Sequence, residues 1–473
     1  MRQLSASPNP SQRVGLGDAI IMGLSSSGPS QTLAVTLASL VAVSGYSGVI
    51  PILICFVPMI GIAIGYQRLN RWDQSSGATY TWVAKVFHPY LGFLSGWMIL
   101  LYYTLGTTTL TIPAGIYTID LLAPSLIENH WAIFIVGAAW NLLITALAIM
   151  GLKIVARFEW AIVLFEYSVI LIVAAVALIA LAHGNGAAQF SWAWFSWSGM
   201  GGMKGLMGGI LIACFMYSGW DAAIYVNEET VDRANNPGKA ALASVMMLAL
   251  IYSVATFAFQ SVLSPDELHA HAGNALSAVT GRLLHKPWDS LMALVVLTGT
   301  LASLQSAVVS AARVGLAMSR DRVMPGFFQL IRAGSSSPWA ATLAMSGINL
   351  LLLALALSTT GIAAALTNAA SSLGLISIIF YGITAAAALR QQHATMTSSL
   401  ANVILGGLLP LIGVLFSVAV LVASLVTGAV NLTVILYGLG SITIGAMVAI
   451  YLHRFQGVRF FNSLDAAQSP AAR

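Results

Sequence analysis

The sequence contains very little charge. Only 7% of its 473 residues are Asp, Glu, Lys or Arg, whereas 58% are hydrophobic. Soluble globular domains carry about 25% charged residues, so this chain has too little charge to cover a surface in contact with water. The shortage excludes a soluble globular protein and predicts a polytopic protein that lies in a lipid bilayer.

Cysteine is also scarce, because Cys55 and Cys214 are the only two and both fall in apolar runs. Neither a disulfide framework nor a zinc site is therefore expected. The sequence offers no cluster of metal ligands, no nucleophile–base pair and no phosphate-binding loop, so we expect no cofactor, no metal and no enzyme activity.

The first sixteen residues hold two arginines and two prolines without an apolar core, so a cleavable signal peptide is not expected.

What the sequence has instead is long apolar runs. A transmembrane helix needs about 20 predominantly apolar residues, and the runs lack the alternation of a membrane barrel. An all-α membrane protein with twelve transmembrane helices is therefore predicted. The predicted spans are 17–41, 47–68, 91–119, 131–150, 159–183, 204–227, 239–262, 288–316, 339–358, 361–389, 401–425 and 430–452.

The distribution of basic residues predicts the orientation. An even number of spans places both termini on one side of the membrane, and all lysines and arginines except Lys204, Arg282 and Lys286 fall on that side. Since cytoplasmic loops carry an excess of these residues, both termini are predicted to be cytoplasmic. The net charge of +5 has the same explanation, and no nucleic-acid partner is expected.

Two of the predicted spans are interrupted near their middles. The first contains Ser25-Ser26-Ser27-Gly28-Pro29 and the sixth contains Ser218-Gly219-Trp220-Asp221. Serine competes for backbone hydrogen bonds, glycine is a poor helix former, and proline suits the first turn of a restarted helix. Unwound backbone at membrane depth is tolerated only where protein or a water-filled cavity satisfies it. Matched breaks in two halves indicate the binding site of an inverted-repeat transporter, with two unrelated kinks as the alternative.

Four segments form a pattern in the order in which they occur. They are Tyr66 to Trp97, Ser218 to Ala240, SRDRVMPGFF from Ser319 and SSSPWAA from Ser335. Together they resemble the amino acid–polyamine–organocation (APC) superfamily, and in particular its amino acid permeases. The resemblance implies a secondary active transporter in the inner (cytoplasmic) membrane that moves amino acids or organic amines.

The resemblance also implies a leucine-transporter-like fold, in which two five-helix repeats of opposite topology precede two C-terminal helices. The chain is accordingly divided into a cytoplasmic tail at 1–16, a first repeat at 17–200, a second repeat at 201–390, helices 11 and 12 at 391–453, and a cytoplasmic tail at 454–473. The short tails favour a transporter over a non-transporting nutrient sensor on the same fold. The sequence does not predict an oligomeric state.

The two breaks are the predicted substrate site. Free N–H groups where the first helix restarts favour a carboxylate, and unpaired carbonyls where the sixth helix stops favour an ammonium group. Both together suit a zwitterionic amino acid, whereas the carbonyls alone suit an amine. Aromatic side chains at the second break either close over the ligand or pack between helices. The predicted substrate-binding residues are Ser25, Ser26, Ser27, Gly28, Phe215, Tyr217, Ser218, Gly219, Trp220 and Asp221.

Three acidic residues allow alternative interpretations. Asp221 either binds a positive group of the substrate or caps the inner half-helix. Glu166 falls where proton-driven members of the family often have a lysine, and burial away from water favours a neutral carboxyl group. Glu166 and Glu159 are therefore candidates for proton coupling, with a packing contact from Glu166 to Ser306 or Ser310 as the alternative. Proton-coupled import is favoured over a polyamine or diamine importer and over an amino acid/amine antiporter.

Two further acids, Glu228 and Glu229, follow the sixth predicted span. They lie at its cytoplasmic end and are interpreted as an inner gate or a structural contact. Arg157 and Arg233 are the predicted partners, because both fall on the same predicted side of the membrane.

Overall fold

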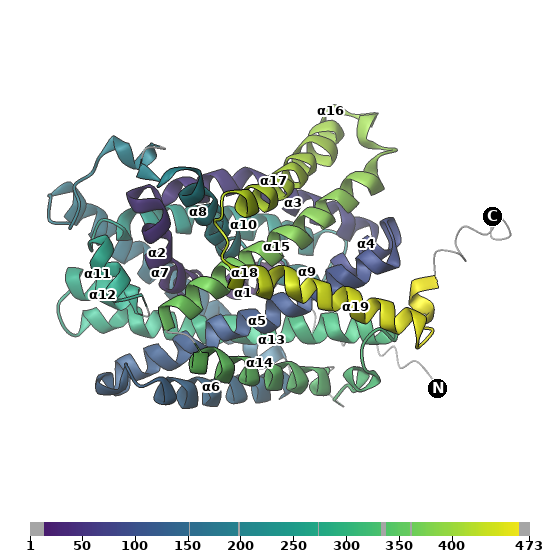
Figure 1. Ribbon diagram of the computed structural model, residues 1–473, viewed down its shortest axis with the longest axis horizontal. Helices are drawn as coiled ribbons and strands as arrows, with labels where there is room; N and C mark the ends of the chain where they lie inside the picture. The colour runs from purple at the N-terminus through teal and green to yellow at the C-terminus, as the bar shows by residue number, and fades with distance from the viewer. Residues whose placement is uncertain are drawn as a thin grey trace.

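The computed structural model describes residues 14–150, 152–196, 199–272, 274–332, 337–359 and 362–462. This part of the chain is built from helices (Figure 1). Its β-structure is a single parallel bridge between Val14 and Thr230. Most of the two predicted tails falls outside the described residues.

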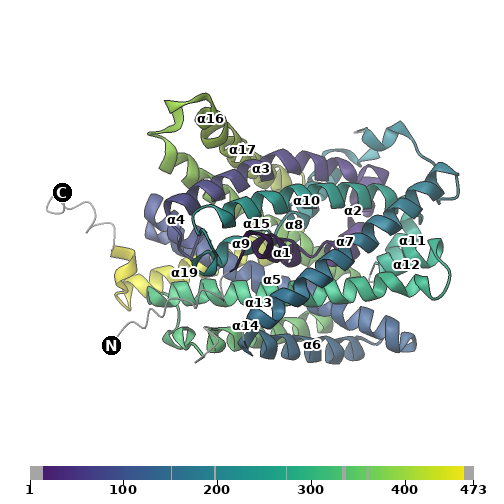
Figure 2. The same ribbon diagram turned by 180° about the vertical axis from the view of Figure 1, so that it is seen from behind.

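The longer helices run side by side, roughly along the longest axis of the molecule (Figures 1 and 2). In chain order the helices are α1 Leu16–Ser27, α2 Pro29–Ser44, α3 Val49–Trp72, α4 Thr79–Val86, α5 Pro89–Leu122, α6 His130–Met150, α7 Leu152–Ala182, α8 Gly202–Met216, α9 Ala222–Tyr225, α10 Asn236–Phe259, α11 Pro265–Ala270, α12 Ala275–Leu283, α13 Leu291–Arg320, α14 Trp339–Thr359, α15 Ile362–Gln392, α16 Leu400–Asn402, α17 Leu409–Val426, α18 Leu432–Ile435 and α19 Ser441–Arg454. Short π-helical segments connect α16 to α17 and α18 to α19.

Nine helices of the described part are long and apolar enough to cross a membrane. They are Val49–Trp72, Pro89–Leu122, His130–Met150, Glu159–Ala182, Asn236–Phe259, Leu291–Arg320, Leu366–Gln392, Leu400–Val426 and Leu432–Arg454. Two shorter apolar helices, Gly202–Met216 and Trp339–Ala354, add to these. The first predicted span is divided into α1 and α2, so neither half has the length of a full span. The protein is a multi-pass membrane protein, and the number of twelve spans stays a prediction.

The interrupted helices lie inside a frame of longer ones. On one side α5 packs along α13, with α6 and α14 beside them, and on the other side α3 packs on α10 and α17 (Figures 1 and 2). Between these groups α1 contacts both α10 and α13, while α2 contacts α8 and α13. The helix breaks are therefore surrounded by continuous helices, which shield their backbone from lipid.

Glycine allows some of these helices to approach backbone to backbone. A Cβ on Gly374 of α15 would lie 2.1 Å from the Leu211 carbonyl oxygen of α8, and a Cβ on Gly61 of α3 would lie 2.1 Å from the Leu409 carbonyl oxygen of α17. No side chain fits at either position. Small residues serve the same purpose at helix contacts in membranes generally, which accounts for part of the high glycine content of 43 residues.

Candidate functional site

The first helix breaks at Gly28, as the sequence predicts. α1 ends at Ser27, Gly28 has left-handed backbone angles (φ 47°, ψ 75°), and α2 begins at Pro29. The Gly28 N–H donates to the Leu24 carbonyl oxygen at 3.0 Å and so closes α1. A Cβ at Gly28 would lie 2.1 Å from the Ser303 hydroxyl oxygen. Both the positive φ and the close approach require glycine at this position.

The sixth predicted span breaks between α8 and α9. α8 ends at Met216 and the four-residue helix α9 begins at Ala222. Between them Gly219 has φ +100°, and a Cβ there would lie 3.0 Å from the backbone of Ser26 and Ser27. The two breaks therefore touch each other, with the backbone of one against the backbone of the other. This contact supports the matched-break interpretation over two unrelated kinks.

Hydroxyl groups from neighbouring helices satisfy the exposed carbonyls of the first break. The Ser303 hydroxyl of α13 donates to the Ser25 carbonyl oxygen at 2.6 Å. The Ser27 carbonyl oxygen accepts from the Thr32 hydroxyl at 2.7 Å and from the Tyr252 hydroxyl of α10 at 3.3 Å. Buried carbonyls without a partner are costly, so these donors stabilise the unwound turn.

A cavity lies beside the two breaks. Its lining combines the break residues with one face of α2 and one face of α5. The lining residues are Ser26, Ser27, Gln31, Thr32, Tyr102, Tyr103, Gly106, Thr109, Leu110, Phe215, Ser218 and Ala307. None of these described lining residues carries a charged side chain. Hydroxyl, amide and aromatic groups are suited to a small polar solute that needs no fixed countercharge.

The cavity brings together some of the predicted substrate-binding residues and leaves others outside. Ser26, Ser27, Phe215 and Ser218 line it. The other six, Ser25, Gly28, Tyr217, Gly219, Trp220 and Asp221, are absent from the lining. Their binding role stays a prediction.

Sequence reasoning missed several lining residues. Tyr102, Gly106 and Thr109 were not predicted, although their i, i+4, i+7 spacing places them on one face of α5. Gln31 was also missed, although it follows the Gly28 break by three residues.

Asp221 is held by three tyrosine hydroxyls. Its carboxylate accepts hydrogen bonds from Tyr225 at 2.8 Å, from Tyr381 at 3.0 Å and from Tyr103 at 3.3 Å. The side chain is fully buried and makes no capping hydrogen bond to α9, although Asp221 occupies the N-cap position. The predicted side-chain cap is therefore not observed. Tyr103 both donates to Asp221 and lines the cavity, so the carboxylate lies directly behind the cavity wall.

The aromatic side chains of the second break divide between cavity and packing. Phe215 lines the cavity. Trp220 stacks on Tyr381 with ring centroids 5.2 Å apart and meets Tyr66 edge to face at 5.0 Å. Tyr217 meets Tyr252 edge to face at 6.3 Å. Trp220 and Tyr217 therefore have the packing role that the sequence left open as an alternative.

Glu166 of α7 reaches the start of α2. Its carboxylate oxygen Oε1 accepts a hydrogen bond from the Ser30 backbone N–H at 2.7 Å, and only 1% of the residue is exposed. The predicted alternative contact to a serine of α13 is not the one observed, because the Ser306 hydroxyl lies 3.5 Å from the Met22 carbonyl oxygen instead. Glu159 is also buried on the same helix, seven residues earlier.

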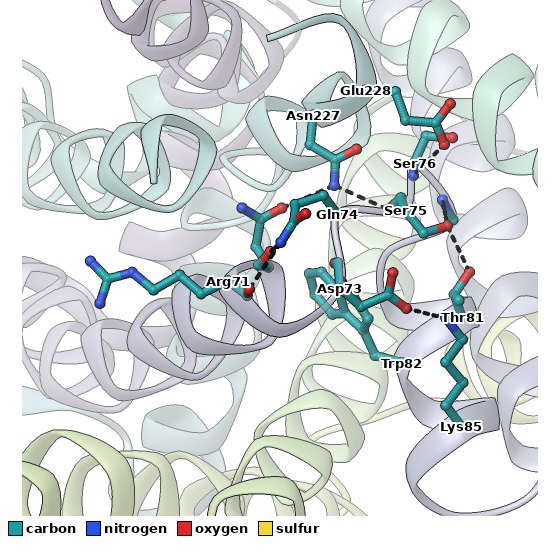
Figure 3. Close-up of polar contacts among 12 residues, drawn as sticks. Arg71, Asp73, Gln74, Ser75, Ser76, Thr81, Trp82, Lys85, Asn227 and Glu228 are labelled. Atoms are coloured by element: carbon teal, nitrogen blue, oxygen red, sulfur yellow. Dashed lines mark hydrogen bonds and ion pairs between the residues drawn. The ribbon is translucent and has the colours of Figure 1, made fainter. Parts of the chain in front are cut away.

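A polar network fastens the loop between α3 and α4 to the residues after α9. Figure 3 shows Glu228 and Asn227 directed at this loop, where the Ser76 N–H donates to Glu228 at 2.9 Å and the Asn227 side chain donates to the Ser75 carbonyl oxygen at 3.1 Å. Burial alone raises the pKa of Glu228, but the Ser76 hydrogen bonds and the Arg320 charge outweigh it and hold the pKa below its usual value.

The acidic pair after α9 has other partners than those predicted. Glu229 forms hydrogen bonds to Arg313 at 3.0 and 3.1 Å, and Glu228 lies 3.6 Å from Arg320. Both arginines belong to α13. The prediction of Arg233 as a partner was wrong because the fold brings the end of α13, distant in sequence, against this turn. The side chain of Arg157 lies outside the described residues.

Known proteins share the fold of this chain. The structure of MhsT in complex with L-phenylalanine matches with a TM-score of 0.61 at 16% identity, covering 86% of this chain and 98% of that one. A manganese transporter of Eremococcus coleocola, solved with an aromatic bis-isothiourea compound, matches with a TM-score of 0.54 at 17% identity over 92% of this chain and 94% of the other. These similarities identify the leucine-transporter-like fold that the sequence predicts.

Sequence comparison gives the family. The chain is 28% identical over 278 residues to the low-affinity putrescine importer PlaP of Escherichia coli strain K12, a match that covers 58% of this chain and 59% of that protein. It is 22% identical to the human large neutral amino acids transporter small subunit 2, over 70% of this chain and 60% of the relative. The matches thus span about three fifths of these relatives. Residues 15–427 match the family model for amino acid permeases, and the chain belongs to that family.

Proposed function

We propose that the protein is a secondary active transporter that moves amino acids or organic amines across the cytoplasmic membrane by alternating access. One observation carries the proposal: the backbones of two broken helices meet at the wall of a polar, uncharged cavity. Helix ends at membrane depth supply backbone groups that bind polar solutes. Membership of the permease family and the transporters among its relatives support the same function.

The lining favours a substrate whose charges balance. Burying an uncompensated charge is costly, and the described lining residues provide hydroxyl, amide and backbone groups but no charged side chain. A zwitterionic amino acid would place its ammonium group near Ser218 and its carboxylate near the start of α2. The aromatic ring of Phe215 would cover the ligand. Gly219, Ser25 and Gly28 would act through the backbone geometry of the breaks.

A diamine is the second candidate substrate. The relative that imports putrescine favours it, and so does the Asp221 carboxylate behind Tyr103. Tyr103 would have to turn away from Asp221 before a cationic group could reach that carboxylate. An amino acid/amine antiporter would bind the zwitterionic amino acid and the amine in turn, each in the way described for it.

We propose that a proton gradient supplies the energy for import. Glu166 and Glu159 are buried on α7 at a spacing of seven residues, which places them on the same side of the helix about 10 Å apart along its axis. The basic residues of the predicted inner loops support cytoplasmic termini in this proposal.

Uptake into proteoliposomes tests the function. We expect purified protein to accumulate radiolabelled L-leucine or putrescine under an inward proton gradient and to lose that accumulation when a protonophore is added. Ala307→Phe should abolish uptake because Ala307 lines the cavity. Leu294→Phe on the same helix is the control, since Leu294 is 43% exposed on the outer surface of the bundle. Equal uptake by the two variants would contradict the proposed site.

A further inference from the structure

The first turn of α2 has few N–H groups for a ligand. Pro29 has none, and the Thr32 N–H donates to the Gly28 carbonyl oxygen at 2.8 Å. The Ser30 N–H is occupied by the Glu166 carboxylate at 2.7 Å. The Gln31 N–H has no acceptor among the residues that the structure describes, and Gln31 lines the cavity. Of the two N–H groups that could bind a substrate carboxylate, that of Ser30 therefore already binds the Glu166 carboxylate, and that of Gln31 does not.

Among the side chains that the structure describes, no lysine or arginine pairs with Glu166. The helices packed against α7 are α1, α2, α10, α12 and α13. Glu166 acts electrostatically on two tyrosines, Tyr252 of α10 and Tyr167 of α7 itself. The other charged groups on these helices and on α7 whose side chains the structure describes are Asp18, Glu159, Lys239, Arg282, Arg313 and Arg320, and none of them forms an ion pair or a hydrogen bond with Glu166.

The surroundings fix the position of the Glu166 carboxylate. Gly299 of α13 faces both partners, because a Cβ there would lie 2.6 Å from the Ser30 hydroxyl oxygen and 2.9 Å from Glu166 Oε1. The Ser30 hydroxyl is directed at the Val295 carbonyl oxygen at 3.4 Å. The side chain of Glu166 is thus confined between α2, α7 and α13, with the N-terminal end of the α2 dipole as its main source of positive potential.

From this arrangement we infer that the Glu166 carboxylate occupies part of the binding position of a substrate carboxylate, and that such a substrate binds together with a proton that neutralises Glu166. The inference rests on the proposed transport function and narrows it to substrates that carry a carboxylate. Glu166 is here a specificity-determining residue, and Ser30 and Gln31 supply the shared N–H donors.

Electrostatic repulsion explains the coupling. A substrate carboxylate on the Gln31 N–H would lie next to the Glu166 carboxylate on the Ser30 N–H, in a buried site where no described side chain supplies a cation. Two carboxylates that share such a site hold one proton between them. The proton goes to Glu166, which then gives up its charged hydrogen bond to Ser30, and no bond to carbon is made or broken. An amine without a carboxylate leaves Glu166 in place and takes up no proton there.

Binding measurements on the purified full-length protein in detergent test this inference. The probes are two pairs that differ only in the carboxylate: L-leucine with 3-methylbutylamine, and L-ornithine with putrescine. Equilibrium dialysis between pH 5 and pH 8 gives the affinity of each. For a probe with a carboxylate we expect affinity to increase by up to tenfold for each unit of decreasing pH, as the linked uptake of one proton requires. The amines should show no such increase.

Two variants separate the role of Glu166 from general effects. Glu166→Gln removes the charge and keeps the shape, so amino acid affinity should become independent of pH and stay near the value of the wild type at low pH. Glu128→Gln makes the same chemical change at an exposed carboxyl group and should behave as the wild type. Folding of each variant is checked by its thermal midpoint before binding is measured.

The outcomes are distinct. Amino acid affinity that does not change with pH in the wild type, or a pH dependence that survives in Glu166→Gln, overturns the inference while leaving transport intact. Binding of the amines alone overturns it as well and favours the diamine substrate. If no probe binds at any pH, the proposed function fails and the inference falls with it.

Discussion

Replacing Gly28 by alanine should damage the protein in two separable ways. The first is backbone strain, because a residue with a Cβ in the left-handed region costs about 1–2 kcal/mol, and Gly28 has φ 47°. The second is a steric clash, because the new Cβ would lie 2.1 Å from the Ser303 hydroxyl oxygen. Overpacking of a buried site costs about 1–3 kcal/mol. The two effects together predict a loss of roughly 2–5 kcal/mol of stability.

A second glycine isolates the strain from the clash. Gly184 has φ 72°, and no atom lies within 4 Å of the position of its Cβ. Gly184→Ala should therefore lose only the strain, about 1–2 kcal/mol. Ser303→Ala removes the hydroxyl oxygen of the clash but also the hydrogen bond to the Ser25 carbonyl. The loss caused by Gly28→Ala should therefore be smaller when measured against Ser303→Ala than against the wild type, although the Ser303 Cβ still lies 3.2 Å away.

Thermal midpoints in detergent at a fixed scan rate, together with uptake into proteoliposomes, measure these effects. The expected order of midpoints for the single glycine variants is wild type, Gly184→Ala, and Gly28→Ala as the lowest, and the fall caused by Gly28→Ala should be smaller in the Ser303→Ala background than in the wild type. Uptake should be retained in Gly184→Ala and lost in Gly28→Ala. Equal midpoints for the two single glycine variants would refute the argument, because the contact with Ser303 would then have no energetic weight.

Three more predictions follow from the buried polar contacts. Asp221→Ala leaves three tyrosine hydroxyls without an acceptor, so its thermal midpoint should fall further than that of Asp221→Asn, which keeps an oxygen acceptor; a smaller fall for Asp221→Ala would contradict this. The pKa of Glu228 is lowered in the folded protein, so the stability that its charged form contributes is complete above about pH 4.3 and is lost as the pH falls through the lower folded pKa. The difference in thermal midpoint between wild type and Glu228→Gln should therefore shrink on acidification. A difference that grows would show that folding raises this pKa instead. Gly299→Ala should cost about 1–3 kcal/mol because its Cβ would lie 2.9 Å from Glu166 Oε1, whereas Gly347→Ala, with open space around its Cβ, should not lower the midpoint.

Features set by neighbouring residues could be predicted from the sequence. Gly28 followed by Pro29 specifies the end of one helix and the start of the next, since glycine accepts a positive φ and proline fits the first helical turn. The same holds for Ser218-Gly219. The apolar runs predicted the long helices, and the four segment patterns predicted the fold and the family.

Features that depend on the packing of distant helices could not be predicted. Ser30 and Glu166 are 136 residues apart, and their contact requires the rotation of α7 that points Glu166 at α2. The prediction of free N–H groups where the first helix restarts is corrected at Ser30 for that reason. Likewise Tyr381, which holds Asp221 together with Tyr103 and Tyr225, lies 160 residues from the aspartate.

The contact between Gly219 and the Ser26 backbone has a consequence for how such a protein changes over time. Where main chain packs on main chain, the geometry of the contact depends on the φ angles of Gly28 and Gly219 and on their lack of a Cβ. It depends little on which side chains surround it. Side chains around the cavity, such as Phe215 and Thr109, are then free to be exchanged without moving the frame that presents them. A few substitutions in the lining can therefore accommodate a new substrate. A single alanine at Gly28 or Gly219 would instead weaken the binding of every substrate alike.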